Sequence, residues 1–260
     1  MKAQTIETRK GARCRVLEAG SGMPVVFLHG AGGLLADNPF LDGLAARYHV
    51  FAPELPGYGE SAGEELLEDM LDFTLHGWDV VGALGLTRPH LVGHSMGGMI
   101  AAEMAAIAPN DLGRLVLADA AGLWIEEHPI PDIFAMLPGQ LVELLFQDAD
   151  KGQALLTGGV DFSDMEAFKE FYLGQQRRLA MAGKILFPIP NRRVSKRLYR
   201  VTAPTLVLWG GADKLIIPAY AERWARLIPG AQVQIIPDAG HMLPYEQPEV
   251  FVDAVSRFLG

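Results

Sequence analysis

The stretch that decides the fold is Gly93-His94-Ser95-Met96-Gly97-Gly98. It lies between residues 89–92, an apolar run that predicts a buried strand, and residues 99–108, an alanine- and methionine-rich run that predicts a buried helix. In this context a G-x-S-x-G pattern is typical of a serine held on a tight strand-to-helix turn, with glycines where the backbone approaches itself closely. We therefore predict that Ser95 is a nucleophile; the alternative is an ordinary glycine-rich turn.

Outward from this turn, short apolar runs alternate with helical patterns along most of the chain. The runs predict strands at 24–28, 49–53, 115–118, 205–209 and 233–236, and the helical patterns lie at 64–84, 219–228 and 248–258. Such alternation predicts an α/β fold with a mostly parallel sheet flanked by helices on both faces.

The alternation stops between residues 124 and 196. This segment is helical in pattern, is interrupted by prolines (Pro190 among them), and lies between two expected strands. We expect it to form an inserted helical cap, or lid, over a core made of residues 1–123 and 197–260.

Composition limits the classes of function. Half of the residues are hydrophobic and a fifth are charged, which excludes a disordered chain. The net charge of −9 argues against nucleic acid as a partner, because phosphate binding requires a basic surface. Cys14 is the only cysteine, so neither an intramolecular disulfide nor a cysteine zinc site can form. No stretch has the character of a signal peptide or a membrane helix, so we expect a cytoplasmic protein without a membrane partner.

A serine hydroxyl is a weak nucleophile and needs a base. Of the seven histidines, His241 follows the last expected strand, at the sheet edge where ligands gather in α/β folds. We predict that His241 is the base. Five of the other six histidines have different expected roles. His49, His76 and His90 are expected to be structural, His128 to lie in the cap, and His94, next to the serine, to point away from it.

The base in turn needs an acid that orients it. Asp213 follows the strand 205–209 in the segment WGGAD and gives the chain order Ser, Asp, His. We predict that Asp213 is this acid. Two alternatives are Asp119, which ends the strand 115–118, and Asp238, which is close to His241 in sequence.

The segment HGAGG (29–33) follows the strand 24–28. Consecutive glycines leave backbone N–H groups free to point at an oxyanion, and the residue after a nucleophile supplies a second donor. The expected donors are the N–H groups of Met96 and of Ala31 or Gly32. A plain glycine turn is the alternative for this segment.

Five segments together resemble the α/β-hydrolase fold superfamily, above all its cap-bearing serine hydrolases. They are HGAGG (29–33), ELPGYGES (54–61), GHSMGG (93–98), WGGAD (209–213) and GHMLPYEQPE (240–249). The resemblance covers nearly the whole chain and implies Ser95 as nucleophile, Asp213 as acid, His241 as base and a lid between the sixth and seventh strands. Epoxide hydrolases and haloalkane dehalogenases of this superfamily carry Asp at the nucleophile position, so Ser95 disfavours both.

The expected activity is hydrolysis of a small-molecule carboxylic ester through an acyl-enzyme, without cofactor or metal. A lactone is an alternative substrate to an open-chain ester, and the sequence does not determine the oligomeric state. A non-catalytic protein that keeps the fold to bind a ligand is a further alternative, which the ordered triad residues disfavour.

Carbon–carbon hydrolases of meta-cleavage pathways are the second enzymatic hypothesis, because they are similar in the SMGG segment. They commonly carry Asn and Trp where this chain has His94 and Met242. Such enzymes bind an acidic substrate with a cap arginine, for which Arg177 and Arg178 are candidates. We favour an exposed helix face for this pair, because runs of charge are usually solvated.

Overall fold

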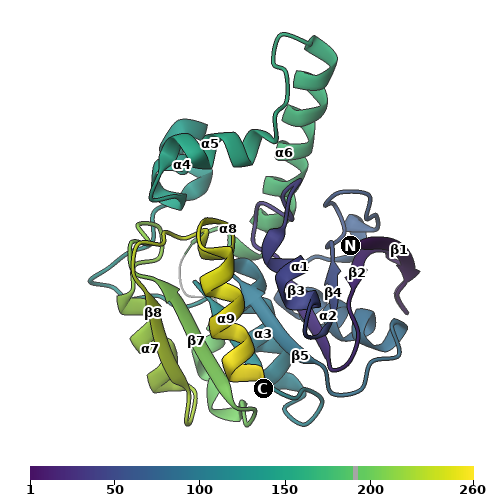
Figure 1. Ribbon diagram of the computed structural model, residues 1–260, viewed down its shortest axis with the longest axis vertical. Coiled ribbons are helices and arrows are strands. Elements are labelled where there is room, and N and C mark those ends of the chain that lie inside the picture. Colours follow the sequence, from purple (N-terminus) through teal and green to yellow (C-terminus); the bar gives the residue numbers. More distant parts are fainter. Residues whose placement is uncertain (190–192) are drawn as a thin grey trace.

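A single eight-stranded sheet organises the computed structural model, which describes residues 1–189 and 193–260 (Figure 1). The strand order is β1-β2-β4-β3-β5-β6-β7-β8. Pairing is antiparallel for β1 with β2 and for β2 with β4, and parallel elsewhere, so the predicted mostly parallel sheet is confirmed. The strands are β1 (Lys2–Glu7), β2 (Arg13–Ala19), β3 (Pro24–Leu28), β4 (His49–Pro53), β5 (His90–His94), β6 (Leu115–Ala118), β7 (Thr205–Gly210) and β8 (Gln232–Ile236).

Helices cover both faces of this sheet (Figure 1). One apolar core lies between the sheet and α2, α3 and α7, and a second lies between the sheet and α1, α8 and α9. Each core contains side chains from the strands, because successive side chains of a strand point to opposite faces of the sheet. The helices are α1 (Pro39–Ala45), α2 (Met70–Ala83), α3 (Met96–Ile107), α7 (Ala219–Leu227), α8 (Leu243–Glu246) and α9 (Pro248–Leu259).

The amino-terminal hairpin of β1 and β2 and the short helix α1 were not predicted. Only alternate residues of β1 are even partly buried, and its remaining residues are exposed. Antiparallel strands at a sheet edge bury one face, so their apolar signal is weak. The predicted helix 64–84 is also corrected: it begins only at Met70, where Asp69 caps it by accepting hydrogen bonds from two backbone N–H groups.

Between β6 and β7 the chain forms α4 (Pro138–Leu145), α5 (Ala149–Thr157) and α6 (Met165–Leu186), with no strand among the described residues. These helices stand beyond one end of the sheet, and α6 projects furthest from it (Figure 1). Residues 190–192, which the expected cap includes, lie outside the described residues. In the part of the chain that is described, no helix has both the length and the apolar character to cross a membrane.

Candidate active site

Ser95 lies on the turn between β5 and α3. Its φ of 53° and ψ of −117° are unusual for a residue with a side chain, and strain of this kind is often found at functional sites. The flanking glycines make the turn possible. A Cβ on Gly97 would collide with the Leu28 carbonyl, and one on Gly93 would collide with the carbonyl of Gly97.

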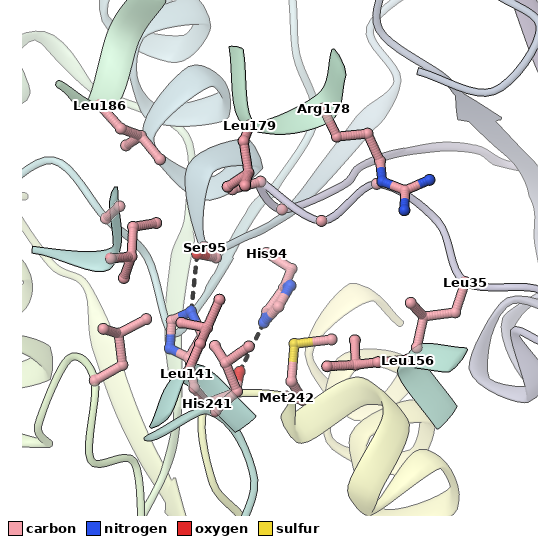
Figure 2. Close-up of a pocket in the computed structure, with 18 of the residues that line it drawn as sticks. Leu35, His94, Ser95, Leu141, Leu156, Arg178, Leu179, Leu186, His241 and Met242 are labelled. Atoms are coloured by element: carbon pink, nitrogen blue, oxygen red, sulfur yellow. Dashed lines mark hydrogen bonds between the residues drawn. The ribbon is translucent and has the colours of Figure 1, made fainter. Parts of the chain in front are cut away.

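His241 and Asp213 complete a continuous hydrogen-bonded relay with Ser95 (Figure 2 shows its first link). His241 Nε2 lies 2.9 Å from Ser95 Oγ, and His241 Nδ1 lies 2.8 Å from Asp213 Oδ2. A carboxylate only accepts hydrogen bonds, so the proton is assigned to Nδ1 and leaves Nε2 free to accept the serine proton. Asp213 Oδ1 accepts from the N–H groups of Leu215 and Ile216, at 2.8 Å each.

Neither alternative acid contacts His241. Asp119 is fully buried at the end of β6, and its Oδ1 accepts from Gly210 N–H at 2.7 Å, while its Oδ2 has no partner among the described residues. Burial and the nearby charge of Asp213 raise the pKa of Asp119 well above its usual range. Asp238 is exposed.

The loop after β3 is held by His29. Its Nε2 accepts from Leu55 N–H at 3.1 Å, so Nδ1 carries the proton and donates to the Gly30 carbonyl at 2.8 Å. Burial lowers the pKa of His29 to about 4, which keeps the ring neutral. The Gly30 carbonyl and the Ala31 N–H belong to one planar peptide and point in opposite directions. His29 and the Gly33 N–H, which donates to the same carbonyl at 3.0 Å, therefore fix where the Ala31 N–H points, a role for His29 that was not predicted.

This loop lies directly beside the serine. A Cβ on Gly30 would be 3.3 Å from Ser95 Cβ, and Ala31, Gly32 and Ser95 all line the same pocket. Met96, the next residue, begins α3, where N–H groups have no partner within the helix. The three residues expected to supply oxyanion donors therefore lie near Ser95: Ala31 and Gly32 share its pocket, and Met96 follows it in the chain.

His94 was expected to point away from the serine, and this was wrong. It lines the pocket, and its Nε2 donates to the His241 carbonyl at 2.7 Å (Figure 2). Burial lowers the pKa of His94 to about 3. A neutral His94 therefore supports the backbone of His241.

The remaining histidines are not pocket residues. His49 pairs with Glu18 at 2.6 Å, and His90 Nδ1 accepts from Arg114 N–H at 2.9 Å. Two others, the buried His76 and the exposed His128, also lie outside the pocket lining.

The pocket above Ser95 has a volume of about 370 Å³ and a mostly aliphatic wall. Core loops contribute Ser95, His94 and His241 to its lining, and we call the part contributed by α4, α5 and α6 its roof; Figure 2 labels residues of both parts. Six of the roof residues are leucines: Leu141, Leu145, Leu155, Leu156, Leu179 and Leu186. Within residues 1–189 and 193–260, no three His, Cys, Asp or Glu side chains gather as a metal site.

Arg177 and Arg178 have different surroundings, so the expectation that both lie on an exposed face is corrected. Arg177 leaves the pocket and pairs with Glu64, with Nη2 2.7 Å from Oε1. Arg178 is half-buried and lines the pocket (Figure 2). Its guanidinium has no ion pair or hydrogen bond within the described part of the chain, and the charge of Glu54 that acts on it is already paired with Arg15 at 3.1 Å.

Comparison with known proteins identifies the family. Residues 25–254 match the profile of the Alpha/beta hydrolase family. A component of the acetoin cleaving system of Cupriavidus necator, a dihydrolipoyllysine-residue acetyltransferase, is 34% identical over 96% of this chain and 67% of its own length. A 2-hydroxy-6-oxo-6-(2'-aminophenyl)hexa-2,4-dienoic acid hydrolase of Metapseudomonas resinovorans is 28% identical over 96% of this chain and 88% of its own. The solved structure of a thermophilic esterase from Thermogutta terrifontis superposes with a TM-score of 0.73 at 25% identity, covering 100% of this chain and 98% of that one.

Proposed function

This chain belongs to the alpha/beta hydrolase family, and on that premise we propose that it hydrolyses small-molecule carboxylic esters, with Ser95 as nucleophile, His241 as base and Asp213 as acid. The observation that carries the proposal is the relay of 2.9 and 2.8 Å from Ser95 Oγ through His241 to Asp213. Hydrogen bonds of this length are what a base needs to take a proton from a nucleophile.

In the first half-reaction, His241 Nε2 accepts the Ser95 proton while Oγ bonds to the ester carbonyl carbon. The carbonyl oxygen becomes an oxyanion, which the N–H groups of Met96 and of Ala31 or Gly32 stabilise by hydrogen bonds. The tetrahedral species then expels the alcohol oxygen, which takes the proton from His241, and the acyl group stays on Ser95.

In the second half-reaction, water replaces the alcohol. His241 Nε2 takes one water proton as the oxygen attacks the acyl carbon, and Ser95 Oγ leaves and recovers that proton. The products are a carboxylic acid and the free enzyme. Throughout, Asp213 keeps His241 in the required tautomer and stabilises its charged form.

We also propose that residues 124–196 act as a lid on a core of residues 1–123 and 197–260. The pocket roof comes from α4–α6, so closure of this segment removes water from the ester and strengthens each polar interaction with it. Leucines dominate the roof, which suits an apolar acyl or alcohol group.

One observation favours a second candidate, carbon–carbon bond hydrolysis of a diketo acid. Arg178 places a cation in a mostly apolar pocket, and its guanidinium has no ion pair among the described residues, so a substrate carboxylate would pair with it. The same chemistry at Ser95 serves both reactions, so the rest of the pocket has to discriminate between them.

The experiment compares kcat/KM for a short nitrophenyl ester, a lactone and a dienoate diketo acid. We expect the ester to exceed the diketo acid by at least about tenfold, which is 1.4 kcal/mol of transition-state binding. A higher kcat/KM for the diketo acid than for the ester would favour carbon–carbon bond hydrolysis. A higher kcat/KM for the lactone than for the nitrophenyl ester would identify the substrate class as lactones. Ligand binding without turnover of any of the three would support the non-catalytic alternative.

A further inference from the structure

Four apolar side chains are exposed together at the far end of the cap. They form what we call the tip cluster: Phe162, Met165, Phe168 and Tyr172, which expose 46%, 73%, 43% and 52% of their surface. Their rings are ordered against one another, since Phe162 and Phe168 lie 6.0 Å apart and Phe168 and Tyr172 lie 6.2 Å apart. A contiguous exposed apolar patch of this kind marks an interaction site more often than single exposed side chains do.

The helix that carries the cluster has little protein around it. Of the 22 residues of α6, only Met181, Ala182 and Ile185 are fully buried, and all three lie in its last turns. The first turns form the outermost end of the molecule (Figure 1). The spacing of residues 165, 168 and 172 places them along one side of the helix. This side is therefore apolar and uncovered in the described structure.

The cluster is continuous with the wall of the active-site pocket. Phe162 contacts Phe171, with 5.3 Å between ring centroids, and Phe171 lines the pocket together with Val160 and Gln175. The tip cluster is therefore in direct contact, through Phe171, with the wall of the pocket that contains Ser95.

Charge decides which surface fits the cluster. Residues 161–170 contain four carboxylates, Asp161, Asp164, Glu166 and Glu170, and one lysine, Lys169. An anionic surface would be repelled by this net negative charge, whereas basic clusters are what anionic lipids attract. Aromatic rings with polar tips settle well at the boundary between neutral headgroups and hydrocarbon.

The exposed apolar area of the tip cluster is too small for a stable interface with a second copy of this chain. At about 200 Å² for a large side chain, the exposed fractions leave roughly 400 Å² of apolar surface. A stable protein interface buries about 800 Å² on each partner. Insertion into a lipid surface has no such threshold, because each side chain enters the boundary on its own.

We propose that the tip cluster docks the cap onto a neutral, zwitterionic lipid surface and so presents the pocket to apolar molecules dissolved there. This proposal departs from the sequence-based expectation of no membrane partner. The docking is independent of the chemistry at Ser95.

The test measures flotation with phosphatidylcholine vesicles, using the Ser95→Ala protein so that no lipid is consumed. Phe168→Ser combined with Tyr172→Ser is the test variant. Leu71→Ser combined with Leu75→Ser is the matched control, because these two α2 side chains are exposed by 53% and 46%. We expect the test variant to lose at least about tenfold in partition coefficient and the control to be unchanged, with little effect of salt because the contact is apolar. Met165→Ser alone should give a smaller loss, and unchanged melting temperatures establish that the variants are folded.

Three results would overturn the proposal. The first is that the Ser95→Ala parent does not float with phosphatidylcholine vesicles. The second is that the test and control variants bind the vesicles equally well. The third is that binding requires anionic lipid and disappears at high salt. A dimer in sedimentation that only the test variant loses would assign the cluster to a second copy instead. Turnover of a soluble nitrophenyl ester by the wild type, measured in parallel, tests the ester proposal separately.

Discussion

Asp213→Asn exchanges one carboxylate oxygen for an amide NH₂ group, and the surrounding donors decide which oxygen is replaced. Oδ1 accepts from the N–H groups of Leu215 and Ile216 at 2.8 Å each, so an NH₂ group there would face two donors. Each lost bond costs about 1 kcal/mol or more, and leaving the buried N–H groups unpaired adds to that cost. The amide oxygen therefore stays at the Oδ1 position, and the NH₂ group takes the Oδ2 position opposite His241.

That orientation reverses the tautomer of the base. An NH₂ group opposite His241 Nδ1 requires Nδ1 to accept a hydrogen bond, so the ring proton moves to Nε2 and Ser95 loses its proton acceptor. The negative charge that stabilises a charged imidazole is lost as well. We expect kcat to fall by about 10³ to 10⁴ with a nearly unchanged KM, because the change acts on the chemical step.

Asp119→Asn is the matched control, measured with the same nitrophenyl ester. The pKa of Asp119 is raised well above its usual range, which favours the uncharged form that Asn imitates, and an Asn side chain keeps the oxygen that accepts from Gly210 N–H. We expect a loss below about tenfold, because no group at His241 changes charge. If Asp119→Asn is the more damaging substitution, the acid lies after β6 and the reasoning from the Asp213 hydrogen bonds is wrong.

Three further predictions follow from single side chains. Ser95→Ala should lower kcat by about 10⁴ to 10⁶ without unfolding the protein, and a fluorophosphonate that labels another residue in peptide mass spectrometry would contradict this. Arg178→Met should raise KM about tenfold or more for a substrate with a carboxylate and leave a neutral ester unaffected, whereas Arg177→Met should alter neither; equal effects would mean that Arg178 does not contact substrate. Burial lowers the pKa of His76 from 6.5 to about 4, so the unfolded chain takes up the proton first and stability is lost as pH falls through this range. His76→Leu should therefore reduce the loss of unfolding free energy between pH 7 and pH 5 by about 2 kcal/mol in urea titrations, and an unchanged pH slope would refute the assignment.

The sheet and the meeting of the three site residues were predictable because they depend on local signals and one topological rule. The strand, turn and helix around Ser95 lie within about twenty consecutive residues, and each has a strong apolar or glycine signal. Asp213 and His241 follow strands in the same sheet, and the carboxyl ends of parallel strands lie at one edge. The edge strand β1 and its neighbour β2 lacked such a signal because polar residues interrupt the apolar residues of both strands.

It was not predictable from the sequence that Arg178 lines the pocket while Arg177 lies outside it. Adjacent residues on a helix point about 100° apart, so one of the two can face a pocket while the other faces solvent. Which one does so depends on how α6 lies on the core. In this structure the rotation is fixed by the few buried side chains of its last turns, Met181, Ala182 and Ile185. The sequence contains no local signal for that rotation.

Two hydrogen-bond bridges couple the cap to the reacting groups. The Tyr58 hydroxyl lies 3.1 Å from the carbonyls of both Ala31 and Arg178, so one side chain joins the oxyanion loop to α6. Glu246 accepts from Gly240 N–H next to His241 and from Gln147 N–H in the cap, at 2.7 Å each. A lid that opened would have to break both bridges, leaving these polar groups to water. On the proposed function, the same motion would release the loops that carry the expected oxyanion donors and the expected base, so we expect closure of the proposed lid and assembly of the catalytic geometry to be coupled.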